Sequence, residues 1–218
     1  LYCIILYHGQ GNPLKKLVRE PNMLINGYRK YDADAENMKK SVEILAKRYG
    51  SENHVLFEPT SAYFLEVTKN DWETFSKTLI EIIRKYSNNI IITAAIGWPQ
   101  NLEFALDYNS YFKNVVFGIM IYPGTTEKIK KEIVIIKKKF PIIVTECGYE
   151  PINPKEPVLA GTKEYAIALK KFLNKNALSF FVWCYHPKRQ PIILNSWDPN
   201  DLSEWGKFVK EELLENKK

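Results

Sequence analysis

The sequence of 218 residues has little of several features that define other classes of protein. Three cysteines are too few for a disulfide-stapled scaffold. No apolar run approaches the roughly 18 residues that a membrane-spanning helix needs. Neither sign of charge dominates, because 31 basic and 25 acidic residues are interspersed, which indicates a mixed surface. We therefore expect no nucleic-acid partner and no membrane partner.

Glycine and histidine patterns are equally sparse. The one glycine cluster, Gly9-Gln10-Gly11, lacks the third glycine of a dinucleotide-binding loop and leads into Asn12-Pro13, so it is a weak nucleotide signal. The three histidines, His8, His54 and His186, have no metal-ligand spacing. This predicts neither a metal nor a cofactor, and His186 is expected on a surface loop. Cys3, Cys147 and Cys184 are expected to be buried free thiols on or beside strands.

What the chain does have is 45% hydrophobic and 13% aromatic residues, enough for a folded core. Runs rich in Val, Ile and Phe alternate with amphipathic stretches, and this order predicts an α/β protein with a parallel sheet. Nearly continuous apolar strands suit a sheet covered on both faces. The expected strands are 2–7, 54–60, 89–95, 114–121, 141–146 and 178–184. The expected helices are 34–49, 71–86 with Asn70 as its N-cap, 125–140, 163–174 and 201–214.

Polar and aromatic residues gather where these strands end. In a parallel barrel the chemistry lies at the carboxyl ends of the strands. These ends carry His8, Thr60-Ser61-Ala62, Gly97-Trp98-Pro99, Tyr122-Pro123-Gly124, Thr145-Glu146-Cys147-Gly148 and Trp183-Cys184-Tyr185-His186. One carboxylate surrounded by Trp and Tyr is typical of a sugar site, because aromatic faces stack on sugar rings and a carboxylate attacks an anomeric centre.

At this point the sequence resembles a known family over essentially its whole length. It is similar to the (β/α)8 barrel of glycoside hydrolase family 5, which is cellulase-like. The stretches that resemble its strands four to eight and its last helix are Leu45–Glu58, Ile90–Asn101 with Trp98-Pro99-Gln100, Val115–Gly124, Pro141–Gly148 with Thr145-Glu146-Cys147-Gly148, Phe180–Trp183 and Ser203–Lys210. The resemblance implies a parallel (β/α) barrel of TIM type with six recognisable strands, forming a single domain over residues 1–218.

Two departures from the family pattern stand out, and the first is at the N-terminus. Tyr2 to His8 resembles the third strand of the family, and nothing here matches the first two βα units. Six strands do not close an eight-stranded barrel. We therefore expect a barrel that is incomplete at its N-terminus. In one alternative the chain is a fragment of a longer chain, and a separate segment or partner completes the barrel. In the other the protein is a six-stranded derivative whose exposed edges are covered. The family resemblance implies an extracellular or secreted protein, although this chain shows no signal peptide.

The second departure concerns the acid/base. In the family this glutamate belongs to an Asn-Glu-Pro tripeptide after strand four, and here that tripeptide reads Ser61-Ala62-Tyr63. Ala62 thus stands at the position of the acid/base, and Ser61 at that of its Asn neighbour. Glu58 is an alternative acid/base, but it precedes position 62 by four residues and so lies roughly 13 Å deeper. Such a separation favours a buried structural carboxylate. Glu66 or Asp71 from the following loop is a further alternative.

The resemblance assigns roles to the residues that remain. Glu146 is the nucleophile, Tyr122 donates to its carboxylate and holds it ionised, and Trp183 forms the floor of the sugar site. Substrate contacts are expected from His8, Ser61 and Trp98 as well, while Met120 replaces the family's histidine on strand six. The implied function is a retaining hydrolase of a β-linked glucan or mannan with weak activity. The alternative is a non-catalytic glycan-binding or structural barrel derived from such an enzyme.

Overall fold

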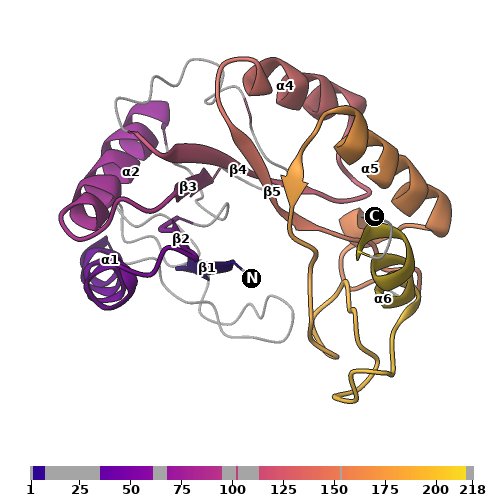
Figure 1. The fold of residues 1–218 in the computed structure, drawn as a ribbon. Helices are drawn as coiled ribbons and strands as arrows, with labels where there is room; N and C mark the ends of the chain where they lie inside the picture. Colours follow the sequence, from indigo (N-terminus) through magenta and orange to yellow (C-terminus); the bar gives the residue numbers. More distant parts are fainter. Residues whose placement is uncertain are drawn as a thin grey trace. The chain divides into compact units, whose positions relative to one another are not determined.

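The structure, a computed structural model, describes residues 2–7, 35–60, 68–94, 102, 113–152 and 154–214. Its strands pair in sequence order, β1-β2-β3-β4-β5-β6 (Figure 1). The pairs β1·β2, β2·β3, β3·β4 and β5·β6 are parallel. All six expected strands are present: β1 Cys3–Leu6, β2 Val55–Glu58, β3 Ile91–Ala94, β4 Val115–Ile121, β5 Ile142–Cys147 and β6 Ser179–Phe180.

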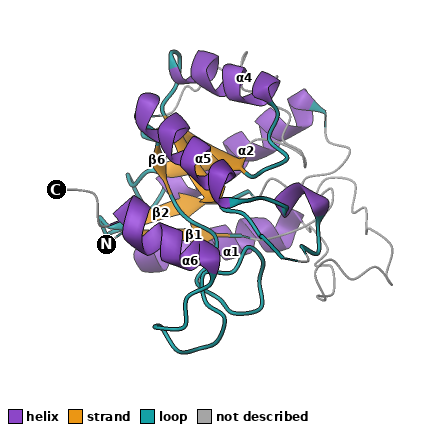
Figure 2. Cartoon of the chain, turned by 90° about the vertical axis from the view of Figure 1, so that its right-hand side faces the viewer, coloured by secondary structure: helices purple, strands orange, loops and turns teal. Residues whose placement is uncertain are grey.

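Helices alternate with these strands, which confirms the α/β class (Figure 2). They are α1 Ala35–Tyr49, α2 Lys69–Arg84, α4 Glu127–Lys137, α5 Lys163–Lys175 and α6 Glu204–Phe208, with a 3-10 turn η1 at Pro157–Leu159 and a π-helical end η2 at Val209–Leu214. In the part of the chain that the structure describes, no helix has both the length and the apolar character needed to cross a bilayer.

The chain forms two compact units. Unit 1 comprises Leu1–Gly118 and Ile135–Pro141, and unit 2 comprises Ile119–Val134 and Ile142–Lys218. Strand β4 passes from the first unit into the second. The single domain expected over residues 1–218 stays a prediction, and each unit is described below by itself.

In unit 1, strand alternation decides which side chains meet the helices. The ring of Phe117 in β4 lies 6.0 Å from Trp72 of α2 and 6.2 Å from Phe140, measured between centroids. Because successive side chains of a strand point to opposite faces, Val116 and Gly118 belong to the face turned away from these helices. The same alternation of side chains continues beyond Gly118 and is used below to place Tyr122 at the candidate site.

The start of β3 and the start of β4 are held by one arginine that the sequence did not single out. Nη1 of Arg84 donates to the carbonyls of Ser87 (3.2 Å) and Asn89 (2.8 Å). Its Nη2 donates to the carbonyls of Lys113 (2.8 Å) and Asn114 (3.1 Å). The side chain thereby satisfies four backbone acceptors at the amino ends of two neighbouring strands, which fixes where those strands begin.

The N-cap of α2 differs from the expected one. Thr68, not Asn70, caps the helix, and its Oγ1 accepts from the backbone N–H of Asp71 at 3.1 Å. Thr68 has the extended backbone of an N-cap, so the helix begins two residues earlier than the apolar pattern indicates. The expectation of Asn70 as the cap is therefore wrong, because the apolar periodicity does not fix the first residue of the helix.

In unit 2, an aromatic cluster fastens α6 beside the end of β5. Tyr149 is fully buried and makes an edge contact with Trp205 at 5.5 Å, and its hydroxyl donates to Glu204 Oε1 at 2.8 Å. Ser203 caps α6 by accepting from the N–H of Gly206 at 2.9 Å. The helix expected from residue 201 therefore starts at Glu204. Figure 2 shows α5 beside α6, and Lys170 of α5 pairs with Glu212 of η2 at 2.7 Å.

Candidate active site

The centre of the candidate site is a carboxylate–tyrosine pair in unit 2. The hydroxyl of Tyr122 donates to Oε2 of Glu146 at 2.8 Å. Tyr122 follows β4, five residues after Phe117, so by alternation it belongs to the face turned away from the helices. Glu146 is the penultimate residue of β5. The hydrogen bond expected from the sequence is therefore present at the carboxyl ends of two adjacent strands.

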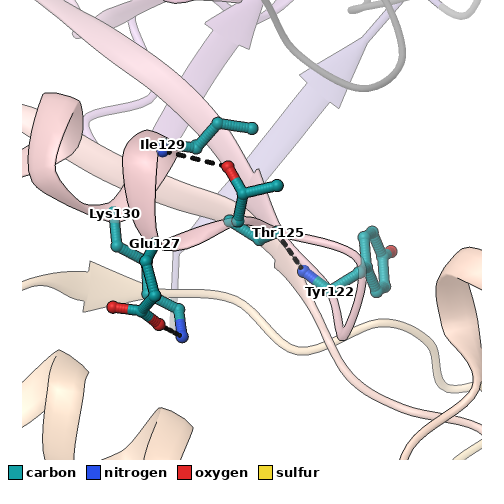
Figure 3. Close-up of polar contacts among 6 residues, drawn as sticks. Tyr122, Thr125, Glu127, Ile129 and Lys130 are labelled. Atoms are coloured by element: carbon teal, nitrogen blue, oxygen red, sulfur yellow. Dashed lines mark hydrogen bonds and ion pairs between the residues drawn. The ribbon is translucent and has the colours of Figure 1, made fainter.

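The turn after β4 fixes the backbone of Tyr122 (Figure 3). Its N–H donates to Oγ1 of Thr125 at 3.0 Å. The next threonine, Thr126, accepts from the N–H of Ile129 at 3.3 Å at the start of α4, where Lys130 and Glu127 form an ion pair. Two adjacent threonines thus serve the turn and the helix in succession, which leaves little freedom in the position of the tyrosine.

Burial dominates the electrostatics of Glu146. Only 8% of the residue is exposed, and this burial raises the pKa of its carboxyl to about 7, although the hydrogen bond from Tyr122 lowers it. The tyrosine acts in the expected direction, but it does not keep the carboxyl fully ionised at neutral pH. At pH 7 the group divides between its acid and its carboxylate forms, a state compatible with either acid or nucleophile chemistry.

The thiols near Glu146 have raised pKa values. Burial, together with the charge of Glu146, raises the pKa of Cys147 to about 12, and its Sγ lies 3.4 Å from the carbonyl oxygen of Phe181. Burial also raises the pKa of Cys184 to about 11. All three cysteines are free, as expected. The expectation of burial is confirmed for Cys147 but not for Cys184, which is half-buried. It is wrong for Cys3, which is exposed because the first residues of β1 are not covered in the described part of the chain.

Trp183, the expected floor of the sugar site, is fastened at its backbone and at its ring. Its N–H donates to the carbonyl of Cys147 at 2.9 Å, and its own carbonyl accepts from the indole of Trp205 at 2.8 Å. Its indole N–H donates to the carbonyl of Gln190 at 3.2 Å. The Trp183–Cys184 peptide is cis. The strand expected over 178–184 is shorter in the structure, where β6 spans Ser179–Phe180, although the backbone N–H of Phe181 still donates to the carbonyl of Val144 in β5 at 2.8 Å.

Two polar residues that the sequence reasoning missed tie the loop after β6 to the loop after β5. Oε1 of Gln190 accepts from the N–H of Lys155 at 2.7 Å. Oε2 of Glu150 accepts from the N–H of Ile192 at 3.3 Å. Glu150 is only 6% exposed, and burial raises the pKa of its carboxyl. The only sequence signal for this role was a carboxylate four residues after Glu146, which by itself does not reveal its partner.

Gly148 gives a test of this local packing. A Cβ at this position would lie 2.9 Å from Nε1 of Trp205 and 3.0 Å from the carbonyl oxygen of Trp183, the two atoms of the bond that holds Trp183. We expect Gly148→Ala to lower the free energy of unfolding by about 1–3 kcal/mol, as overpacking does, and to displace Trp183. Urea unfolding measures the effect. Trp205→Phe removes the indole donor, so the loss of unfolding free energy in Gly148→Ala/Trp205→Phe should be smaller than the sum of the two single losses. An unchanged unfolding free energy in Gly148→Ala would contradict the packing described.

The raised pKa of Glu146 predicts a pH dependence of stability. A carboxyl whose native pKa lies above its unfolded value contributes stability fully below pH 4.5 and loses it as the pH rises through about 7. Relative to Glu146→Gln, which cannot ionise, the unsubstituted protein should therefore lose about 3 kcal/mol of its free energy of unfolding between pH 4.5 and pH 8. Urea unfolding at several pH values measures this. The exposed Glu127, whose pKa Lys130 lowers, is the control, because Glu127→Gln should show no such loss; a flat difference for Glu146→Gln would contradict the burial.

The other residues expected at the site are only partly described. Glu58 is the last residue of β2 and is 3% exposed. Glu58 and its neighbour Phe57 both line a small cavity with Val42 and Leu45 of α1 and Ile83 of α2. Asp71 lies in the first turn of α2. The positions of His8, Ser61, Ala62, Glu66 and Trp98 fall outside the described residues, and the catalytic and binding roles of all these residues stay predictions.

Among the described residues, no group of three or more His, Cys, Asp or Glu side chains is placed to hold a metal ion. The chemistry that the described site offers is that of a buried carboxyl, a phenol and an indole. Fold and site together define a TIM-type (β/α) protein with a carboxylate at the carboxyl ends of its strands.

The family is settled by comparison. Residues 1–189 match the model of cellulase, glycosyl hydrolase family 5, and the chain belongs to this family. An endoglucanase from Clostridium saccharobutylicum is 24% identical over 191 residues, which are 82% of this chain and 42% of the relative. The chain thus spans about two fifths of the length of this curated relative.

Solved structures are similar over most or all of the chain. A β-glucanase from Saccharophagus degradans, solved in complex with cellotetraose, matches with a TM-score of 0.81 and 21% identity over 100% of this chain and 68% of its own. The catalytic domain of Thermobifida fusca endoglucanase Cel5A matches with a TM-score of 0.70 and 16% identity over 82% of this chain and 63% of its own. At this identity the likeness concerns the fold, and it confirms the (β/α) fold class expected from the sequence.

Proposed function

We propose that this chain is a retaining β-glycan hydrolase of family 5 in which Glu146 is the nucleophile and the usual acid/base is missing. The observation that supports it most is the 2.8 Å hydrogen bond from Tyr122 to Glu146 at the end of β5. It holds one carboxylate oxygen and leaves the other for attack on an anomeric carbon. Retaining glycosidases form a covalent glycosyl-enzyme through such a carboxylate.

Formation of the glycosyl-enzyme lacks a proton donor, and its hydrolysis lacks a proton acceptor. In the first, an oxygen of Glu146 bonds to the anomeric carbon while the bond to the leaving oxygen breaks, and that oxygen must take up a proton. In the second, water bonds to the same carbon, releases a proton, and Glu146 departs with its electron pair. A glutamate at position 62 would donate the first proton and accept the second, but Ala62 does neither. Turnover of natural substrates should therefore be slow.

The substrate we propose is a β-linked glucan, with mannan as the other β-glycan that the family resemblance allows. The β-glucanase from Saccharophagus degradans, similar over the whole chain, was solved with cellotetraose. The half-buried Trp183 offers an aromatic face of the kind that stacks on such sugars. The same proposal includes a location outside the cell. It also includes a further segment or partner that supplies two more βα units.

Activated substrates separate the two steps. The dinitrophenolate group of a dinitrophenyl β-cellobioside leaves without protonation. We therefore expect a rapid burst of dinitrophenol followed by a stalled glycosyl-enzyme. Azide needs no base, and it should speed turnover and yield a β-cellobiosyl azide, with an acceleration of up to about 10²–10⁴-fold. The measurement is dinitrophenol release with and without azide, with product analysis. Ordinary hydrolysis of β-glucan that ignores azide would instead show that another group, such as Glu58, Glu66 or Asp71, supplies the acid/base.

A second candidate function is a glycan-binding barrel without catalysis. The replacement at Ala62 favours it, since the position most needed for proton transfer carries no ionisable group. This candidate predicts binding of cello-oligosaccharides with no burst from the dinitrophenyl substrate and no response to azide. The same kinetic experiment therefore decides between the two.

A further inference from the structure

The loop between β6 and α6 carries exposed aromatic side chains that the proposed chemistry does not use. Within the described part of unit 2, the large apolar side chains that are exposed are Ile152, Ile167, Tyr185 and Trp197. Both aromatic ones lie in this loop, the gold segment at the lower right of Figure 1. Trp197 is 66% exposed and Tyr185 is 64% exposed. Two large aromatic surfaces in one loop indicate an interaction site more strongly than a single one does.

The ring of Trp197 is supported by a histidine. Its centroid lies 4.9 Å from that of His186, with 70° between the planes. His186 is itself fixed, because its Nδ1 accepts from the N–H of Lys188 at 2.9 Å and its own N–H donates to the carbonyl of Cys184 at 2.7 Å. The tryptophan is therefore held in place while most of its surface stays open.

The backbone around Trp197 is also closed on itself. Leu194 and Leu202 form an antiparallel bridge. Asn195 bonds to Asp201 twice, from backbone N–H to carbonyl at 2.9 Å and from side-chain amide to carboxylate at 2.9 Å. A ligand that binds here meets an ordered surface, so little conformational entropy is lost on binding.

The chemistry of the loop points to an uncharged ligand with hydroxyl groups. Its charges balance, with Lys188 and Arg189 against Asp198 and Asp201. Asn195, Asp198 and Asn200, within three residues of Trp197 in the sequence, are exposed and carry amide and carboxylate groups. A pyranose ring has apolar C–H faces and a rim of hydroxyl groups, so it can stack on the indole while its rim meets polar side chains.

We propose that Trp197, supported by His186, is a stacking platform for a glucose unit of a β-glucan chain, outside the catalytic site at Glu146. Trp183 and Trp197 both belong to the segment between β6 and α6. The proposal rests on the glycan substrate proposed above. It predicts that the platform contributes to the binding of long chains.

Affinity electrophoresis on neutral soluble β-glucan tests the platform. Trp197→Ala should weaken binding about tenfold, and Trp197→Phe, which keeps an aromatic face, should stay within about threefold of the unsubstituted protein. The control is Tyr86→Ala, which removes a 38% exposed tyrosine from unit 1 and should change nothing. A second measurement does not depend on Ala being tolerated: saturating β-glucan should protect native fluorescence from iodide, and this protection should be smaller in Trp197→Phe by the share of Trp197.

The remaining outcomes separate the stacking platform from the proposed hydrolysis. If Trp197→Ala binds as tightly as Tyr86→Ala, the platform is wrong and the proposed hydrolysis is untouched. If binding depends on Trp197 but the dinitrophenyl substrate gives no burst, the platform stands and the hydrolysis is wrong. If the native protein binds no β-glucan, both are wrong. If Trp197→Ala abolishes self-association instead of glycan binding, the loop is an interface between copies and the platform is overturned.

Discussion

Ala62→Glu should raise the hydrolysis of natural β-glucan by up to about 10²–10⁴-fold, the usual worth of a general acid/base. The leaving group of a glucan is a sugar alcohol, which departs poorly unless it is protonated. A glutamate at position 62 would supply that proton and later deprotonate the attacking water. The gain should be far smaller for a dinitrophenyl cellobioside, whose departure needs no acid. The measurement is reducing-sugar release from β-glucan beside dinitrophenol release.

The matched control for this variant is Ala62→Gln, which has the same size and cannot carry a proton for the reaction. A gain in Ala62→Glu alone assigns the effect to acid/base chemistry. An equal gain in both variants would assign it to packing or binding. No gain in either, with the dinitrophenyl burst intact, would contradict the placement of the acid/base at position 62.

Glu146→Ala should lower turnover of both natural and activated substrates by about 10⁴-fold or more, because Glu146 is the carboxyl that accepts from Tyr122 and the covalent step is lost without it. The expected defect lies in kcat rather than in KM, since Trp183 remains in place. Steady-state kinetics on β-glucan and on the dinitrophenyl substrate measure it.

A second buried carboxyl on the same segment is the control. Glu150 is 6% exposed and has a raised pKa, but its carboxylate accepts from the backbone of Ile192. Glu150→Gln can keep that acceptor and should retain most of the activity. Equal losses in Glu146→Ala and Glu150→Gln would indicate that the first variant fails through its fold.

The sequence sufficed for the strand order and for the central pair of the site. Apolar runs with short breaks predict parallel strands because each strand is covered on both faces. Tyr122 and Glu146 follow from family resemblance and strand ends, and their side chains do meet. Such features depend on local pattern, which a single sequence displays.

Features that depend on tertiary partners were not predictable in this way. The bond from Trp205 to Trp183, the acceptor role of Gln190 and the burial of Glu150 join segments that are far apart in the chain. The pKa of Glu146 belongs to the same group, since the effect of burial outweighs that of the hydrogen bond from Tyr122. Sequence pattern predicts the residues of this site, and packing decides their protonation and orientation.

The most direct measurement is covalent trapping of the nucleophile. A 2-deoxy-2-fluoro-β-cellobioside with a dinitrophenyl leaving group needs no acid for the first step, and the fluorine slows the second. We expect the intact mass of the protein to rise by one fluorinated cellobiosyl group, and peptide fragmentation to place the group on Glu146. A label on Glu58 or on another carboxyl, or no label in a protein that nevertheless hydrolyses β-glucan, would contradict Glu146 as the nucleophile.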